Sequence, residues 1–163
     1  MTQVVISLGS NIQPATHLRQ AVERLRACCR VLAVSPVYET APIGVLDQPS
    51  FLNAAVLLET NLDAATLKND ILRPIERKLG RVRTADKNAP RTIDLDITLF
   101  NDQVFDLGQR HIPDSDLLRY AHSAIPVADI VPTWRHPEDG RTLAEIASSL
   151  PATGIRPRPD IIL

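Results

Sequence analysis

Residues 91–100, RTIDLDITLF, alternate polar and apolar side chains in the way that is typical of a half-buried β-strand. Asp94 and Asp96 are two positions apart, so both carboxylates project from the same face of this predicted strand. Alternate residues of a strand lie roughly 6.6 Å apart, close enough for two carboxylates to reach one cation or a close pair. Mg²⁺ is the expected ion, because it prefers oxygen ligands and is usually held by one or two carboxylates. A solvated strand face that merely carries acids is the simpler explanation of an isolated D-x-D pattern.

Further strands are expected on both sides of this stretch. Residues 4–8 and 51–60 are apolar runs, and the first ends at turn formers. Residues 31–38 form a strand that Pro36 interrupts or displaces to an edge, because proline cannot donate to a ladder. A short strand near residues 103–105 is a candidate partner for residues 91–100.

Two amphipathic helices separate these strands. Apolar residues recur at helical spacing over residues 15–29, and again between an Asp63 cap and a Gly80 stop. Pro74 lies inside the second pattern, where the lost backbone hydrogen bond predicts a bend. Residues 39–50 and 81–90 are expected to be loops, and the proline-rich tail PATGIRPRPD to run extended over the surface.

The order of these elements predicts the fold class. Strand, helix, strand, strand, helix, strand is the order of a ferredoxin-like βαββαβ sandwich, an α+β fold whose antiparallel sheet has helices packed on one face. Extra C-terminal elements follow. A chain of 163 residues with 44% apolar content is expected to form a single domain over residues 1–163. The second sheet face is then free to form a site.

Composition excludes several classes of function. The 18 basic and 19 acidic side chains give a formal charge of −1, so no global field attracts nucleic acid or an anionic membrane. No apolar run approaches the length of a membrane span, and the start MTQVVISLGSN lacks the features of a signal peptide, which predicts a cytoplasmic protein. Cys28 and Cys29 are adjacent and cannot build a disulfide framework or a zinc site.

Four cations precede the aspartate strand within eleven residues: Arg81, Arg83, Lys87 and Arg91. Solvated salt bridging is one explanation, worth about 0 to 1 kcal/mol for each exposed pair. The other is a polyphosphate held by magnesium on one side and guanidinium groups on the other, because arginine matches phosphate oxygens bidentately. Both explanations fit the chemistry equally well. The chain has no glycine-rich phosphate-binding fingerprint, so a nucleotide would be held by side chains and metal.

Phe51 and Asn53 fall on one face of the predicted strand over residues 51–60. An aromatic ring and an amide at this spacing could stack on a flat heterocycle and bond to it. Taken alone, a buried phenylalanine beside a turn-facing asparagine is the more common arrangement.

Together these stretches resemble the 6-hydroxymethyl-7,8-dihydropterin pyrophosphokinase family of folate biosynthesis. The resemblance is collinear and covers roughly the first hundred residues. It rests on five stretches: LGSN (8–11), SPVYETAPIG (35–44), DQPSFLNAAVLLET (47–60), GRVR (80–83) and PRTIDLDITLF (90–100).

The resemblance implies that the hydroxymethyl oxygen of the pterin attacks the β-phosphorus of ATP, so that pyrophosphate is transferred and AMP leaves. Asp94 and Asp96 would hold two Mg²⁺ ions, and Arg81 and Arg91 would grip the triphosphate. Such catalysis depends mainly on alignment and charge neutralisation. The nucleotide site implied in this way comprises Glu76, Arg81, Arg83, Lys87, Arg91, Ile97, Asp114 and Tyr120, with Arg83 and Lys87 on a mobile loop.

By the same resemblance the pterin would stack on Phe51 and bond to Asn53, while backbone groups of Thr40, Ala41, Pro42 and Ile43 read its edge. His122 falls where the family has a second stacking aromatic ring.

The second half of the sequence departs from the family pattern at positions that the resemblance assigns to substrate binding. The usual IPH segment reads IPD, which places Asp114 where a histidine helps to bind ATP. Tyr120 and His122 stand where the family has an arginine and a phenylalanine. A register shift of one or two residues would bring His111 or Arg119 into those roles. Asn88 and Ala89 replace a loop tryptophan and glycine, and lower substrate affinity is the simplest expectation.

Three functions remain open from the sequence. The first is the pyrophosphokinase itself, acting as a monomer on small-molecule substrates with ATP and Mg²⁺. The second is a divergent paralogue that uses another pterin alcohol, which the changes at Asp114 and His122 favour. The third is a protein that binds pterin or nucleotide without efficient catalysis.

Overall fold

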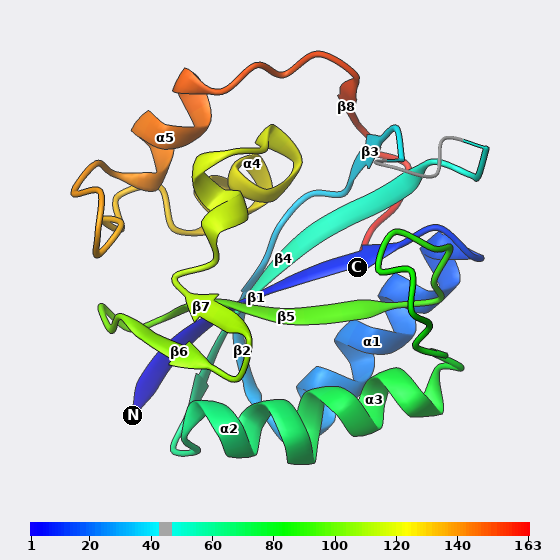
Figure 1. The fold of residues 1–163 in the computed structure, drawn as a ribbon, viewed down its shortest axis with the longest axis horizontal. Coiled ribbons are helices and arrows are strands. Elements are labelled where there is room, and N and C mark those ends of the chain that lie inside the picture. The colour runs from blue at the N-terminus through cyan, green and yellow to red at the C-terminus, as the bar shows by residue number, and fades with distance from the viewer. Residues whose placement is uncertain (43–46) are drawn as a thin grey trace.

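The computed structural model describes residues 1–42 and 47–163 and has β1 (Thr2–Ser10) at the centre of its sheet (Figure 1). This strand pairs antiparallel with β4 (Phe51–Thr60) on one side and with β5 (Asp94–Phe100) on the other. The continuous apolar run over residues 4–6 suits a strand covered on both faces. Val4 and Ile6 point to one apolar cluster, and Val5 points to a second.

The sheet continues beyond β4 through shorter strands. β2 (Arg30–Val34) and β3 (Tyr38–Thr40) both pair with β4, and Pro36 lies in the break between them, as the sequence predicts. β8 (Ile155–Pro157) then pairs with the outer side of β3. The order along the main path is β5-β1-β4-β3-β8. The tail is therefore extended as expected, but it is an edge strand of the sheet rather than a free surface segment.

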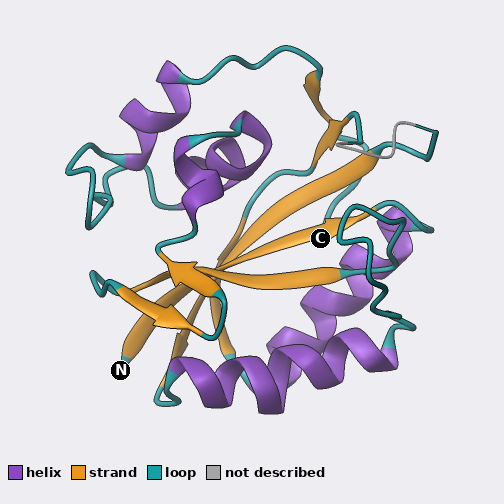
Figure 2. Cartoon of the chain, viewed as in Figure 1, coloured by secondary structure: helices purple, strands orange, loops and turns teal. Residues whose placement is uncertain are grey.

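One face of the sheet is covered by helices that join the strands (Figure 2). They are α1 (Pro14–Cys28) and a long helical segment composed of α2 (Ala64–Thr66), the π-helical turn η1 (Leu67–Leu72) and α3 (Arg73–Lys78). The bend expected at Pro74 takes the form of this wider turn, in which the Arg73 N–H bonds to the Lys68 carbonyl five residues back. Within the part of the chain that the structure describes, no helix is long and apolar enough to cross a membrane.

The extra C-terminal elements cover part of the second face. They are η2 (Ser115–Leu118), α4 (Ala121–Ile130) and α5 (Leu143–Ser149), which pack on Val5, Ala55 and Leu99. The ferredoxin-like α+β prediction is confirmed. The second face stays open near the start of β5, where the aspartates lie.

A small separate hairpin corrects one expectation. β6 (Phe105–Leu107) pairs with β7 (Arg110–Ile112), not with β5 as the sequence suggested for residues 103–105. Gly108 at φ 63° permits the tight turn between them, so the pairing closes locally. The chain after β7 then lies along β5, since the Asp114 N–H donates to the Thr98 carbonyl at 2.9 Å.

Candidate active site

The two aspartates lie on one face of β5, as the alternation of residues 91–100 predicts. The sheet register places Asp94 beside Gly9 of β1, and Gly9 beside Asn53 of β4. Asn53, Gly9 and Asp94 therefore form a row across three strands. The side chains of Asp94 and Asp96 are 22% and 14% exposed, so both can meet a ligand at the surface.

Guanidinium groups surround both carboxylates. Arg91 Nη1 lies 3.2 Å from Asp94 Oδ2, and Arg83 Nη2 lies 4.0 Å from Asp94 Oδ1. Arg110 Nη2 and Arg73 Nη2 approach Asp96 at 3.4 and 3.9 Å. Burial raises the pKa of Asp94, but Arg91 and Arg81 together outweigh it, so the pKa lies below its ordinary value. Burial first, and the charge of Asp94 second, raise the pKa of Asp96 to about 8.

Glu76 of α3 binds two of the surrounding arginines and the backbone of β5. Only 1% of the residue is exposed, and its Oε1 accepts from Arg73 at 2.7 Å and from Arg83 at 2.9 Å. Its Oε2 accepts from the backbone N–H of Leu95 at 2.9 Å, between the two aspartates. Because all of these bonds are to protein groups, the Glu76 carboxylate holds the two arginines and the strand in place. Glu76, which the sequence placed in the nucleotide site, therefore lies under the site and fixes its arginines and strand.

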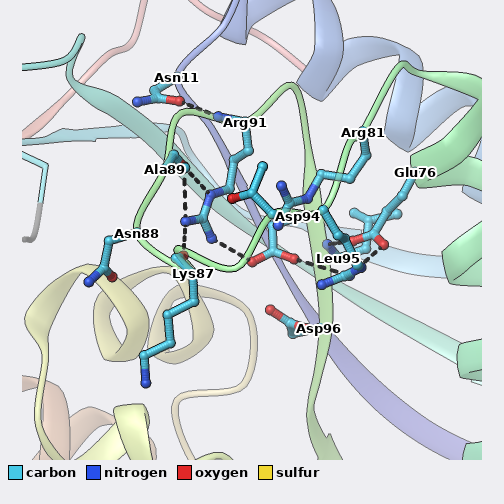
Figure 3. A network of polar contacts seen from close by, with 12 residues as sticks. Asn11, Glu76, Arg81, Lys87, Asn88, Ala89, Arg91, Asp94, Leu95 and Asp96 are labelled. Atoms are coloured by element: carbon cyan, nitrogen blue, oxygen red, sulfur yellow. Dashed lines mark hydrogen bonds and ion pairs between the residues drawn. The ribbon is translucent and has the colours of Figure 1, made fainter. Parts of the chain in front are cut away.

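The loop before β5 is folded back on Arg91 (Figure 3). The Arg91 side chain donates to the carbonyls of Lys87 and Ala89, while its backbone N–H donates to Asn11 Oδ1 at 2.8 Å. Arg81 lies beside them, and its buried Nε has no hydrogen-bond partner among the described residues. Figure 3 shows the Lys87 ammonium pointing away from Asp94. The structure thus brings Arg81 and Arg91 to the carboxylates and leaves Lys87 outside.

The amide of Asn53 and the ring of Phe51 lie on the side of the row nearest β3. Asn53 Nδ2 donates to Thr40 Oγ1 at 2.8 Å, and Thr40 is 8% exposed. The Arg91 guanidinium lies 5.5 Å from the centre of the Phe51 ring, which links this end to the arginine frame. Ala41 and Pro42 follow directly after β3. Ile43 lies outside the described residues.

Residues of the divergent second half lie in two places. Asp114 accepts from Arg110 at 2.7 Å, so it joins the group around Asp96. Tyr120 and His122 stack on each other, with ring centres 5.2 Å apart and planes inclined by 20°. Burial lowers the pKa of His122, which favours the neutral ring. His111 instead bridges Asp106 and Glu138, each at 2.8 Å, outside the site.

Sequence reasoning missed three cations beside Asp96. Lys68, Arg73 and Arg110 line a small cavity together with Asp96 and the partly apolar wall that contains Ile97. Burial, and then the charges of Arg73 and Arg110, lower the pKa of Lys68. The three come from the long helix and from β7, far from Asp96 in the sequence. The only local signal was the spacing of Arg73 and Glu76, three residues apart on a helix.

The donor set fits magnesium. Within residues 1–42 and 47–163, no group of three or more His, Cys, Asp or Glu side chains could hold a metal by protein ligands alone. Mg²⁺ is usually held by one or two carboxylates, with waters and substrate phosphates completing its shell, and Asp94 and Asp96 supply two partly exposed carboxylates. A ferredoxin-like sheet with paired carboxylates inside a guanidinium frame defines the class of enzymes that position a polyphosphate for transfer.

Comparison with known proteins identifies the family within this class. Residues 5–132 match the family model described as 7,8-dihydro-6-hydroxymethylpterin-pyrophosphokinase (HPPK). The chain is 39% identical over 160 residues to the 2-amino-4-hydroxy-6-hydroxymethyldihydropteridine pyrophosphokinase of Pseudomonas aeruginosa, covering 96% of this chain and 97% of that protein. The Bacillus subtilis protein of the same name is 41% identical over 128 residues, covering 77% of this chain and 75% of the relative. This chain belongs to the HPPK family.

Solved structures agree at the level of the fold. The Plasmodium falciparum HPPK-DHPS wild-type structure superposes with a TM-score of 0.70 at 13% sequence identity. The superposition covers 90% of this chain and 44% of that longer one. The relative named folic acid synthesis protein fol1 of Schizosaccharomyces pombe is also longer, since this chain spans 21% of it at 37% identity.

Proposed function

We propose that this protein transfers pyrophosphate from ATP to the hydroxymethyl group of 6-hydroxymethyl-7,8-dihydropterin in folate biosynthesis. The row of Asn53, Gly9 and Asp94 across the sheet carries the proposal. In this row the Asn53 amide, which can bond to a heterocycle, lies in line with the Asp94 carboxylate, which can bind a metal. Arginine side chains surround that carboxylate. Membership of the HPPK family supplies the reaction class.

The pterin would occupy the Asn53 end of this row. Phe51 would stack on its ring, Asn53 would bond to its edge, and the backbone of Thr40, Ala41 and Pro42 would complete that edge. His122 would supply a second wall as a neutral imidazole resting on Tyr120. The hydroxymethyl group would then point along the row toward Asp94.

The triphosphate would occupy the Asp94 and Asp96 end. Arg91 and Arg81 would bond to its oxygens, because guanidinium groups match phosphate oxygens bidentately. Arg83, Arg110 and Lys68 surround the carboxylates and can offset phosphate charge. Asp94 and Asp96 would hold Mg²⁺, two ions with ATP bound, which supply charge neutralisation and alignment of the phosphates.

In the reaction, the hydroxymethyl oxygen forms a bond to the β-phosphorus. The bond from that phosphorus to the oxygen bridging the α- and β-phosphates breaks, and this oxygen leaves with AMP. The protein's contribution is to hold the two substrates in line and to place positive charge around the transferred group. We further propose that the enzyme acts as a cytoplasmic monomer.

The test is AMP formation from Mg-ATP with and without the pterin. Pterin-dependent AMP is expected, and the double substitution of Asp94 and Asp96 by Ala should reduce the rate by more than about a thousandfold, as loss of a metal site does. Asp70→Ala is the matched control, because Asp70 is an exposed acid of the same fold. A double variant that keeps its rate would refute the metal assignment.

The changes at His122 and Asp114 favour a second candidate function, that of a divergent paralogue acting on another pterin alcohol. Arg110 and Asp114 form an ion pair of 2.7 Å beside Asp96, where the family has a histidine. A panel of pterin alcohols should be compared by kcat/KM. If the hydroxymethyl compound is the best substrate, the idea of a divergent paralogue is wrong; tight binding without turnover of any member would instead favour a binding protein.

A further inference from the structure

The strand β3 is held by three different parts of the molecule. Tyr38 Oη donates to Asp129 Oδ2 of α4 at 2.5 Å. Thr40 Oγ1 accepts from Asn53 of β4 at 2.8 Å. Glu39, between them, faces the opposite side of the sheet and binds the C-terminal segment. A strand of three residues has few bonds of its own, so these attachments determine where Thr40 lies.

Two arginines of the C-terminal segment form ion pairs with Glu39. Glu39 Oε2 lies 2.5 Å from Arg156 Nη2 and 3.2 Å from Arg158 Nη1. Arg158 also binds Asp160 at 2.8 Å, and its backbone N–H donates to the Val37 carbonyl at 2.8 Å. The Glu39 side chain is 21% exposed, so this shared carboxylate is partly shielded from solvent and stronger than a single surface pair.

The same segment is anchored in the main core. Ile161 is 8% exposed and belongs to the apolar cluster beneath the sheet, and the Ile162 carbonyl accepts from Arg19 of α1 at 3.3 Å. A hollow of about 360 Å³ lies under β3, lined by the first turn of α1 together with Glu39, Leu52, Arg158 and Ile161. The tail therefore lies beside this hollow and contacts β3 on its outer edge.

We propose that the C-terminal segment over residues 155–161 is a positioning element for the pterin end of the site and acts through Glu39. The proposal rests on the function proposed above, since it assigns Thr40 and Asn53 to the pterin. Glu39 and its arginines touch neither substrate. They hold β3 in the register that keeps Thr40 bonded to Asn53, and they leave the triphosphate end unaffected.

The experiment compares Glu39→Gln with the double variant Arg156→Gln/Arg158→Gln and with the triple variant that combines them. The KM for the pterin should rise about threefold to tenfold in each, while kcat and the KM for ATP stay within about twofold. The effect of the triple variant should be smaller than the product of the other two effects, because partners in one network are not additive. Amide hydrogen exchange over residues 38–42 should quicken in all three.

Glu59→Gln is the matched control. It removes the 2.9 Å pair between Glu59 and Arg30, which also joins neighbouring strands but at the far end of β4. This variant should leave both KM values unchanged. Equal rises in the two KM values, or a pterin KM unchanged in Glu39→Gln, would overturn the proposal.

The experiment distinguishes failure of the proposed function from failure of this inference. If the proposed function is wrong, the wild-type protein will form no AMP. Pterin affinity, measured by fluorescence quenching, then replaces KM in the same comparison. Weaker pterin binding in the three variants would still support the positioning role, whereas equal binding, or no binding by the wild type, would overturn it.

Discussion

Asp96 should make the stability of the metal-free protein depend on pH. Its folded pKa of about 8 lies above the ordinary value, so the folded state keeps a proton that the unfolded chain has released. Stability should therefore fall as pH rises from about 4 through 8, because unfolding then lets the carboxyl release the proton that the folded state holds. In a chelator, the Tm of the wild type should be lower at pH 9 than at pH 6.

Asp96→Asn isolates this effect from the histidines that titrate in the same range. The variant mimics the protonated carboxyl, so its Tm should match the wild type near pH 4 and exceed it increasingly up to pH 9. Thermal melts across this range provide the measurement. Parallel curves for the two proteins would show that Asp96 ionises normally.

Glu76 should matter more for stability than any exposed acid. Gln in its place keeps the shape but removes the charge that binds Arg73 and Arg83. Loss of hydrogen bonds to charged groups should lower the free energy of unfolding by about 2 kcal/mol. Urea melts measure this, with Glu23→Gln on the exposed face of α1 expected to change it by less than about 0.5 kcal/mol. A Glu76→Gln midpoint equal to that of the control would contradict the role.

Much of the site is predictable from single residues. The rest of it could not be predicted, and the reason is physical. Asp94, Asp96, Phe51 and Asn53 follow from strand alternation, because a side chain's face is set by its parity in the sequence. Arg110 reaches Asp96 only through the β6–β7 hairpin. No periodicity within one element encodes such a contact between elements.

Among the elements, the β6–β7 hairpin should respond to pH through His111. Bonds to Asp106 first, and then to Glu138, raise the pKa of this imidazole. The two ion pairs are thus fully present below the ordinary histidine pKa and are lost as pH rises through the higher folded value. A histidine titration by NMR should find the His111 midpoint above that of free histidine in the same buffer. A His111 midpoint at or below that of free histidine would argue against the bridge.

Local pattern alone does not specify every element. The helix continues through Pro74 as expected, but the sequence does not specify that the irregularity there is a π-helical turn over residues 67–72. The segment near 103–105 pairs with β7 because Gly108 allows a tight turn. The tail over residues 151–160 is largely exposed and extended, as expected, but its pairing with β3 over residues 155–157 and the burial of Ile161 just beyond it have no periodic signal in the sequence.

At the scale of the whole molecule, ligand binding should be visible as stability. Mg-ATP at a hundredfold excess over its Kd should add about 2.7 kcal/mol. A chain of this size should then gain about 5 to 10 °C in Tm. Chelator, or Asp94→Asn, should remove most of the gain, because the triphosphate then loses its metal. An equal rise in Tm with chelator present would show that ATP binds through the arginines alone.

Because the whole chain is nearly neutral, ATP binding would depend on the cations around Asp94 and Asp96. With 18 basic and 19 acidic side chains, the overall field supplies no attraction for ATP, so the proposed binding would depend on the local frame of guanidinium groups. The fold collects those groups from the long helix, the loop before β5 and β7. They are dispersed in the sequence and come together only in the folded chain.

Gly9 gives the row across the sheet its open centre. A Cβ built there would lie 3.5 Å from Asn53 Oδ1, which is ordinary van der Waals contact. Gly9 itself places no side chain between Asn53 and Asp94. In the proposed reaction, a pterin on the Asn53 side and a triphosphate on the Asp94 side would therefore meet without a side chain of β1 between them.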